Sequence, residues 1–218
     1  MKHKVLVALF SLFFAIFFTG GCQKAYYGTM EKFGVHKRDI MVDRVEEARD
    51  SQQEAKEQFQ SALEQFSQVL NYKGGKLEDK YKTLQAEYDK SEVKADEVRY
   101  RIDAVEDVSE ALFDEWEDEL GQYTNKSLRR DSERKLVQTM RQYDQLLKAM
   151  RRAEEKIDPV LKAFRDQVLY LKHNLNAQAI ASLQSELVAV ESDIAELIKE
   201  MEKSIGEANS FIRTILEE

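Results

Sequence analysis

The feature that most constrains this chain is a long alternation of four-residue and three-residue steps between apolar side chains. Over residues 41–69 every position on this alternation is apolar except Gln52. This spacing places the side chains along one stripe of an α-helix, and such a stripe must be buried against other helices. The stripe consists of Met41, Val45, Ala48, Gln52, Ala55, Phe59, Ala62, Phe66 and Val69.

Three further stripes of the same kind follow along residues 81–116, 136–175 and 183–215. Short turn signals separate the stripes at residues 72–76, at Gly121 and at residues 174–177. Connections this short force neighbouring helices to run antiparallel. We therefore predict an all-α fold, an elongated antiparallel bundle of four long helices over residues 39–218. The stripes are buried either within one chain or between the chains of a dimer.

Glycine and proline are scarce, with 8 Gly and 1 Pro among 218 residues. Sandwiches, barrels and multi-strand α/β folds need a turn former about every 8–12 residues, so the composition excludes them. The single proline, Pro159, lies inside the third stripe, whose phase continues across it. We predict a kink there, and the alternative is a break with Asp158 as a new N-cap. Ser127 is the predicted N-cap of the third helix and Gly121 the predicted C-cap of the second.

The N-terminus has the pattern of a secretory signal. Two lysines precede a 14-residue uncharged run over residues 5–18, and small residues then lead to Cys22. We predict a signal peptide over residues 1–21, lipidation of Cys22, and a tether to the membrane over residues 22–38. Ordinary cleavage and an uncleaved anchor are the alternatives. Gln23 after the cysteine favours the outer membrane of a Gram-negative cell envelope, with the chain facing the periplasm.

Charge is segregated around Gly121. Nine acidic and no basic side chains lie between residues 103 and 119. In an antiparallel hairpin these acids lie beside a basic block, and the two blocks either neutralise each other or leave a face for anionic lipids or a partner. The basic block contains Lys126, Arg129, Arg130, Arg134, Lys135, Arg141, Lys148, Arg151 and Arg152.

Residue patterns for catalysis or metal binding are missing from the sequence. No phosphate-binding glycine loop is present, and the 3 His and 1 Cys are not spaced as ligands. The excess of acidic side chains argues against nucleic acid. We therefore expect no enzyme activity, metal, cofactor, nucleic acid or small-molecule substrate. Trp116 lies on the second stripe and is predicted to be a core residue.

Several segments resemble a family of bacterial, lipoprotein-like coiled-coil proteins that is known only as a domain of unknown function. The resemblance implies a Gram-negative envelope setting over the chain from Cys22 onward, and it brings no activity or catalytic residue. The segments that carry it are Cys22, Tyr26-Tyr27, Glu31-Lys32-Phe33-Gly34, Lys37-Arg38-Asp39, the turn at 71–76, and the acidic stretch 114–120 with Trp116.

The sequence therefore predicts an extracytoplasmic, lipid-anchored scaffold or interaction protein. Its expected partners are the membrane, through the N-terminal lipid, and either a second copy or another envelope protein. The alternative is a membrane-binding or membrane-shaping module that uses the basic face of the third helix, with Pro159 supplying curvature.

Overall fold

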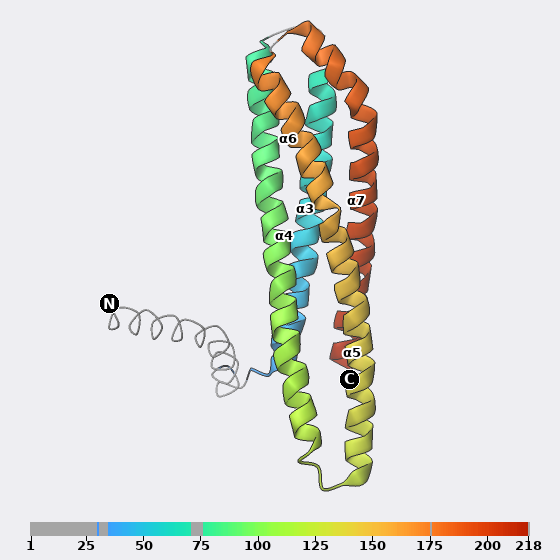
Figure 1. The fold of residues 1–218 in the computed structure, drawn as a ribbon. Helices are drawn as coiled ribbons and strands as arrows, with labels where there is room; N and C mark the ends of the chain where they lie inside the picture. The colour runs from blue at the N-terminus through green and yellow to red at the C-terminus, as the bar shows by residue number, and fades with distance from the viewer. Residues whose placement is uncertain (1–29, 31–34, 71–75, 175, 218) are drawn as a thin grey trace, which may run out of the picture.

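The apolar stripes form long helices that lie side by side and alternate in direction (Figure 1). The computed structural model describes Met30 and residues 35–70, 76–174 and 176–217. Within these residues the helices are α3 (Lys37–Leu70), α4 (Leu77–Leu120), α5 (Lys126–Glu155), α6 (Ile157–His173) and α7 (Ala177–Glu217). The predicted all-α antiparallel bundle of four long helices is confirmed, with α5 and α6 together forming the third helix.

The core is built from the predicted stripes. All nine stripe residues of α3 are buried, and in α7 every stripe position is buried except Leu187, which is half-buried. α3 packs against α4 and α7, and the α5–α6 column packs against the same two helices. At the end of the bundle near residue 70, Phe66 of α3 meets Phe164 of α6 with ring centroids 6.4 Å apart. The stripes are therefore buried within one chain.

The third helix bends without changing its buried face. Helical hydrogen bonding is interrupted only at Lys156, whose backbone keeps right-handed helical angles (φ −80°, ψ −12°). Pro159 cannot donate the hydrogen bond that would join this turn to the helix before it. Met150 and Ile157 on either side are both fully buried, and α6 leans away from the line of α5 in Figure 1. This is the predicted kink. Asp158 lies inside α6 and is not its N-cap.

One cap prediction was wrong and one is confirmed. α5 begins at Lys126, so its N-cap is Asn125 and not Ser127. The Asn125 side-chain oxygen accepts hydrogen bonds from the backbone N–H groups of Ser127 (2.8 Å) and Leu128 (3.3 Å). Gly121 caps α4 as predicted, and its right-handed backbone (φ −69°) shows that the position does not need glycine's freedom at positive φ.

The first half of α5 is less buried than its stripe predicts. Met140 was expected in the core, but 37% of it is exposed, and the buried position next to it is Thr139. Trp116 packs against the core only in part, and its indole N–H donates to the Ser132 hydroxyl at 2.8 Å. The hairpin of α4 and α5 near Gly121 is thus a two-helix extension whose side chains are mostly exposed.

A polar residue lies at the centre of the α3 stripe. Gln52 is fully buried, and neither atom of its amide has a hydrogen-bond partner among the described residues. A buried amide without a partner costs about 1–3 kcal/mol. Gln52→Met keeps the length of the side chain and removes the amide. We expect it to raise the free energy of unfolding by about 1–2 kcal/mol, measured by urea denaturation.

Gln53→Met, at the neighbouring half-buried position, is the control, since the Gln53 amide already donates to Glu57 at 2.6 Å. A loss of stability in Gln52→Met would mean that the amide is satisfied in solution.

Candidate functional site

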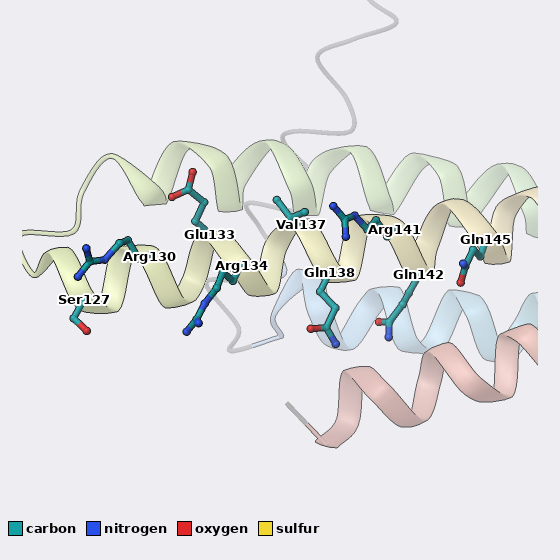
Figure 2. Close-up of a pocket in the computed structure, with 9 residues that line it drawn as sticks. All are labelled: Ser127, Arg130, Glu133, Arg134, Val137, Gln138, Arg141, Gln142 and Gln145. Atoms are coloured by element: carbon teal, nitrogen blue, oxygen red, sulfur yellow. The ribbon is translucent and has the colours of Figure 1, made fainter.

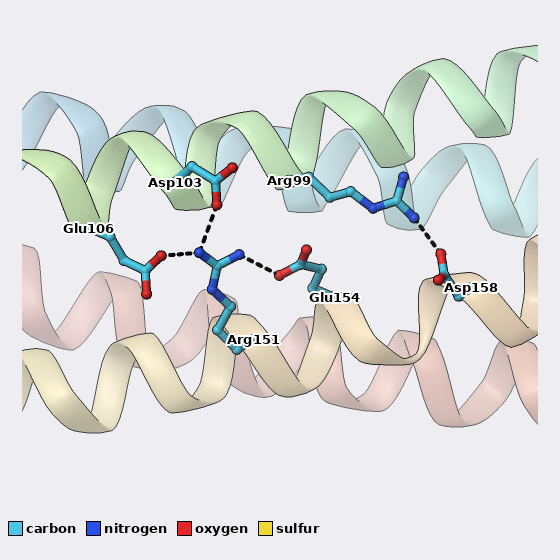
Figure 3. Close-up of polar contacts among 6 residues, drawn as sticks. All are labelled: Arg99, Asp103, Glu106, Arg151, Glu154 and Asp158. Carbon is cyan, nitrogen blue, oxygen red and sulfur yellow. Dashed lines mark hydrogen bonds and ion pairs between the residues drawn. The ribbon is translucent and has the colours of Figure 1, made fainter. Parts of the chain in front are cut away.

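The basic block predicted from the sequence lies along α5, and its members have different partners. Arg151 is the best connected. Its guanidinium donates to Asp103 at 2.7 Å and to Glu106, both on α4, and to Glu154 on α5 at 2.7 Å (Figure 3). Burial lowers the pKa of Arg151, but these hydrogen bonds to Glu154, Asp103 and Glu106 outweigh it and raise the pKa above its ordinary value. Arg151 therefore joins α5 to α4.

A second ion pair joins α4 to the other side of the bend, on α6. Arg99 on α4 donates to Asp158 on α6 at 2.5 Å, next to the interruption at Lys156 (Figure 3). Together the Arg99 and Arg151 contacts hold both sides of the bend against α4. They have a structural role, and Arg151 is not available to an external anion.

Two cations reach α7 instead. The Arg152 guanidinium lies 3.6 Å from Glu200, and the Lys156 ammonium lies 2.8 Å from Glu196. The hydrogen bond to Glu196 and that carboxylate's charge raise the pKa of Lys156, and the same contact lowers the pKa of Glu196. These pairs show that this side of the α5–α6 column faces α7.

The rest of the basic block is exposed. Arg134 pairs with Asp131 at 2.5 Å and Lys148 with Asp144 at 2.6 Å, both within α5 and both in contact with water. Such exposed pairs contribute little to stability. The remaining five have no ion pair with any residue that the structure describes: Lys126, Arg129, Arg130, Lys135 and Arg141. The predicted neutralisation between the blocks is realised directly only at Arg151.

The surface of α5 has a hollow of about 910 Å³, and most of the residues that line it have charged or amide side chains (Figure 2). Among the described residues only α5 lines it, so no second helix encloses it there. Arg130, Arg134 and Arg141 lie along it, with Val137 between the last two and Glu133 at its edge. We call Arg130, Arg134 and Arg141 the arginine stripe. An open surface of this kind suits a macromolecular partner better than a small substrate.

A groove of opposite charge lies between α6 and α7, and the sequence analysis did not identify it. Its volume is about 540 Å³, and Asp166, Glu186 and Asp193 contribute its carboxylates. Gln167, which is only 5% exposed, lines it, and the Oε1 atom of this amide has no partner among the described residues. We call this the α6–α7 groove. Its residues come from two helices, so no motif in the sequence marks it.

Two predicted features lie outside the described residues. Cys22, with the signal segment 1–21 before it, and most of the tether 22–38 are not among them. None of the helices over the described residues is long and apolar enough to cross a membrane. Within the same residues no three His, Cys, Asp or Glu side chains are grouped so that they could hold a metal ion.

The comparison with protein families identifies the class of the chain. Residues 26–215 match the model of a family described as a protein of unknown function (DUF2959), and the chain belongs to this family. The resemblance seen in the sequence is confirmed at this level. No curated protein matches the chain, and no solved structure matches it.

The Arg151 contacts lead to a prediction about stability. Arg151→Met should lower the free energy of unfolding by about 1–2 kcal/mol, because charge-assisted hydrogen bonds across α4 and α5 are lost while solvent already screens part of the charge. Lys148→Met removes an exposed ion pair within α5 and should change the free energy of unfolding by less than about 0.5 kcal/mol. Urea denaturation of both variants measures the difference. Equal values would show that the Arg151 contacts do not hold the bend.

Proposed function

We propose that this chain is a lipid-anchored helical scaffold or interaction protein of the bacterial cell envelope, attached through Cys22. The observation that supports this best is the extended, partly charged surface of the bundle. The two charged surfaces described above are both open, as befits contacts with large partners. α4, with 44 residues, is about 66 Å long, which suits a protein that spans distance.

The N-terminal end of α3 fits attachment at one end of the bundle. The Lys37 ammonium, on the first residue of α3, lies 2.8 Å from Glu115, near the end of α4. Fourteen residues lie between Cys22 and Lys37 and reach at most about 50 Å when extended. A lipid on Cys22 would therefore hold this end of the bundle close to the membrane.

The anchor is tested by changing the cysteine. We expect wild-type protein to remain in carbonate-washed membranes and Cys22→Ser to move to the supernatant, because one lipid-bearing residue supplies the attachment. Ser91→Ala, a buried position on α4, is the control and should stay with the membrane. Retention of Cys22→Ser in washed membranes would contradict a lipid anchor.

A second candidate, direct membrane binding by α5, is favoured by the exposed cations near Gly121. Lys126, Arg129 and Arg130 lie at the same end of the bundle as the start of α3, where the anchor would hold them near lipid. Each cation near an anionic surface contributes about 1 kcal/mol. The acidic residues at the end of α4, among them Asp118 and Glu119, oppose this attraction.

Vesicle co-sedimentation separates the two candidates. If α5 binds lipid, residues 23–218 should pellet with anionic vesicles at low salt and less so at high salt, and not with neutral vesicles. The double variant Lys126→Glu/Arg129→Glu should then stay in solution. If residues 23–218 bind no vesicle in any condition, direct membrane binding is excluded, and the first candidate, a scaffold attached only through its lipid, is the one left.

A further inference from the structure

The arginine stripe on α5 is a surface without a fixed partner in the chain. Arg130 and Arg141 make no ion pair with any described residue, and Arg134 has only Asp131, three residues before it. Both side chains of that pair are exposed, Arg134 to 79% and Asp131 to 50%. Val137, 44% exposed, lies between Arg134 and Arg141. The stripe thus presents cations around an apolar side chain (Figure 2).

The α6–α7 groove presents the complementary chemistry. Asp166, Glu186 and Asp193 make no ion pair within the part of the chain that the structure describes. Between Glu186 and Asp193, Ala189 and Val190 form an apolar part of the groove. The groove therefore presents carboxylates on either side of small apolar side chains, and a buried amide at Gln167 without a partner for its oxygen.

The spacing of the two surfaces matches. Arg134 and Arg141 are seven residues apart on α5, and Glu186 and Asp193 are seven residues apart on α7. Seven residues are two turns, or about 10.5 Å along each helix. Val137 follows Arg134 by three residues, just as Ala189 follows Glu186. Two helices laid side by side would bring both charge pairs and the apolar pair together at once.

Both surfaces lie on the same side of the molecule. Positions 134, 141, 145 and 152 follow one face of α5 in steps of seven and four residues, and Lys156 in the turn after α5 continues this spacing. Arg152 and Lys156 on this face reach Glu200 and Glu196 of α7, so the face is the one directed toward α7. The groove lies between α6 and α7 further along the same side. Residues 137 and 163 are separated by about 39 Å of helix, so the stripe and the groove of one chain cannot meet.

We propose that a second copy of this chain docks on this side, with the arginine stripe of each copy in the α6–α7 groove of the other. The two copies are antiparallel and related by a two-fold axis that crosses the α5–α6 column near residue 150. Arg134 of one copy then faces Asp166 and Glu186 of the other, and Arg141 faces Asp193. The contact forms twice, so the dimer is closed.

The register within one chain supports this axis. The Arg152–Glu200 and Lys156–Glu196 pairs set α7 antiparallel to α5 and α6, which places Glu186 level with Asp166. In the antiparallel copy, α5 therefore runs in the same direction as the α7 it meets. A single position of the two-fold axis therefore brings Arg134 of one copy to Glu186 of the other and Arg141 to Asp193. This proposal does not depend on the lipid anchor at Cys22.

Charge reversal tests the dimer. The full chain in mild detergent is studied by sedimentation equilibrium, and we expect a protein mass twice that of a single chain, which is 25.4 kDa before any cleavage, with dissociation favoured by salt. Arg134→Glu/Arg141→Glu and Glu186→Arg/Asp193→Arg should each raise the dimer Kd by at least about 100-fold, because like charges then face each other. An equimolar mixture of the two variants should dimerise again, since both contacts of the mixed pair are complementary.

The matched control is Arg129→Glu/Arg165→Glu, which reverses two exposed cations that line neither the stripe nor the groove and should leave the dimer Kd unchanged. Circular dichroism verifies that each variant is folded. The proposal is overturned if the wild type is monomeric at every concentration, if reversal leaves the Kd unchanged, or if the mixture stays monomeric. A wild type that remains monomeric but binds anionic vesicles through Arg134 and Arg141 would assign the stripe to lipid instead.

Disulfide cross-linking gives a second test that does not alter charge. Val137→Cys/Ala189→Cys in a Cys22→Ser background should form a disulfide-linked dimer under mild oxidation, because a bond between these positions within one chain is geometrically impossible. Val137→Cys/Val188→Cys, with the second cysteine one residue away at a position that is 72% exposed, is the control. Equal cross-linking of both variants, or none of either, would overturn the proposed register.

Discussion

Burial of the α3 stripe is the contact on which the rest of the structure depends. α3 packs along both α4 and α7, and its alanines at 48, 55 and 62 leave room for these helices to approach. Ala95 on α4 is equally buried. Phe59 fills the space between the levels of Ala55 and Ala62, and Phe66 lies one turn beyond Ala62. Because α5 and α6 pack on α4 and α7, displacement of α3 would remove the support of the whole column.

The stripes could be predicted because helix periodicity is a local property of the sequence. The α3 stripe is buried at all nine positions, and the phase of the third stripe correctly predicted a kink at Pro159. The errors lie where local rules compete. Asn125 and Ser127 are both good N-caps, and the choice depends on where the chain leaves the Gly121 turn. Met140 has helical phase but no opposing helix surface, so it remains exposed.

The charged surfaces could be predicted only in part. The order of charges between residues 103 and 152 predicted an acidic block and a basic block on neighbouring helices. Which of these charges form ion pairs depends on the distance between the helices, and the sequence does not give that distance. Only Arg151 lies where α4 presents two acids within reach, whereas Arg129 and Arg130 lie on the exposed hairpin. The α6–α7 groove could not be predicted, because Asp166 and Glu186 come from different helices and are level only in the antiparallel register.

The proposed two-fold pair would have a consequence for the proposed attachment to a membrane. Each copy's α3 starts beside the end of its own α4, at Glu115, so an antiparallel pair has the two starts at opposite ends. Two lipids on one membrane would then hold both ends of the pair and lay the bundle along the surface. A monomer held by one lipid is free to stand away from it. In this proposal the oligomeric state would therefore decide which face of the bundle remains open to further partners.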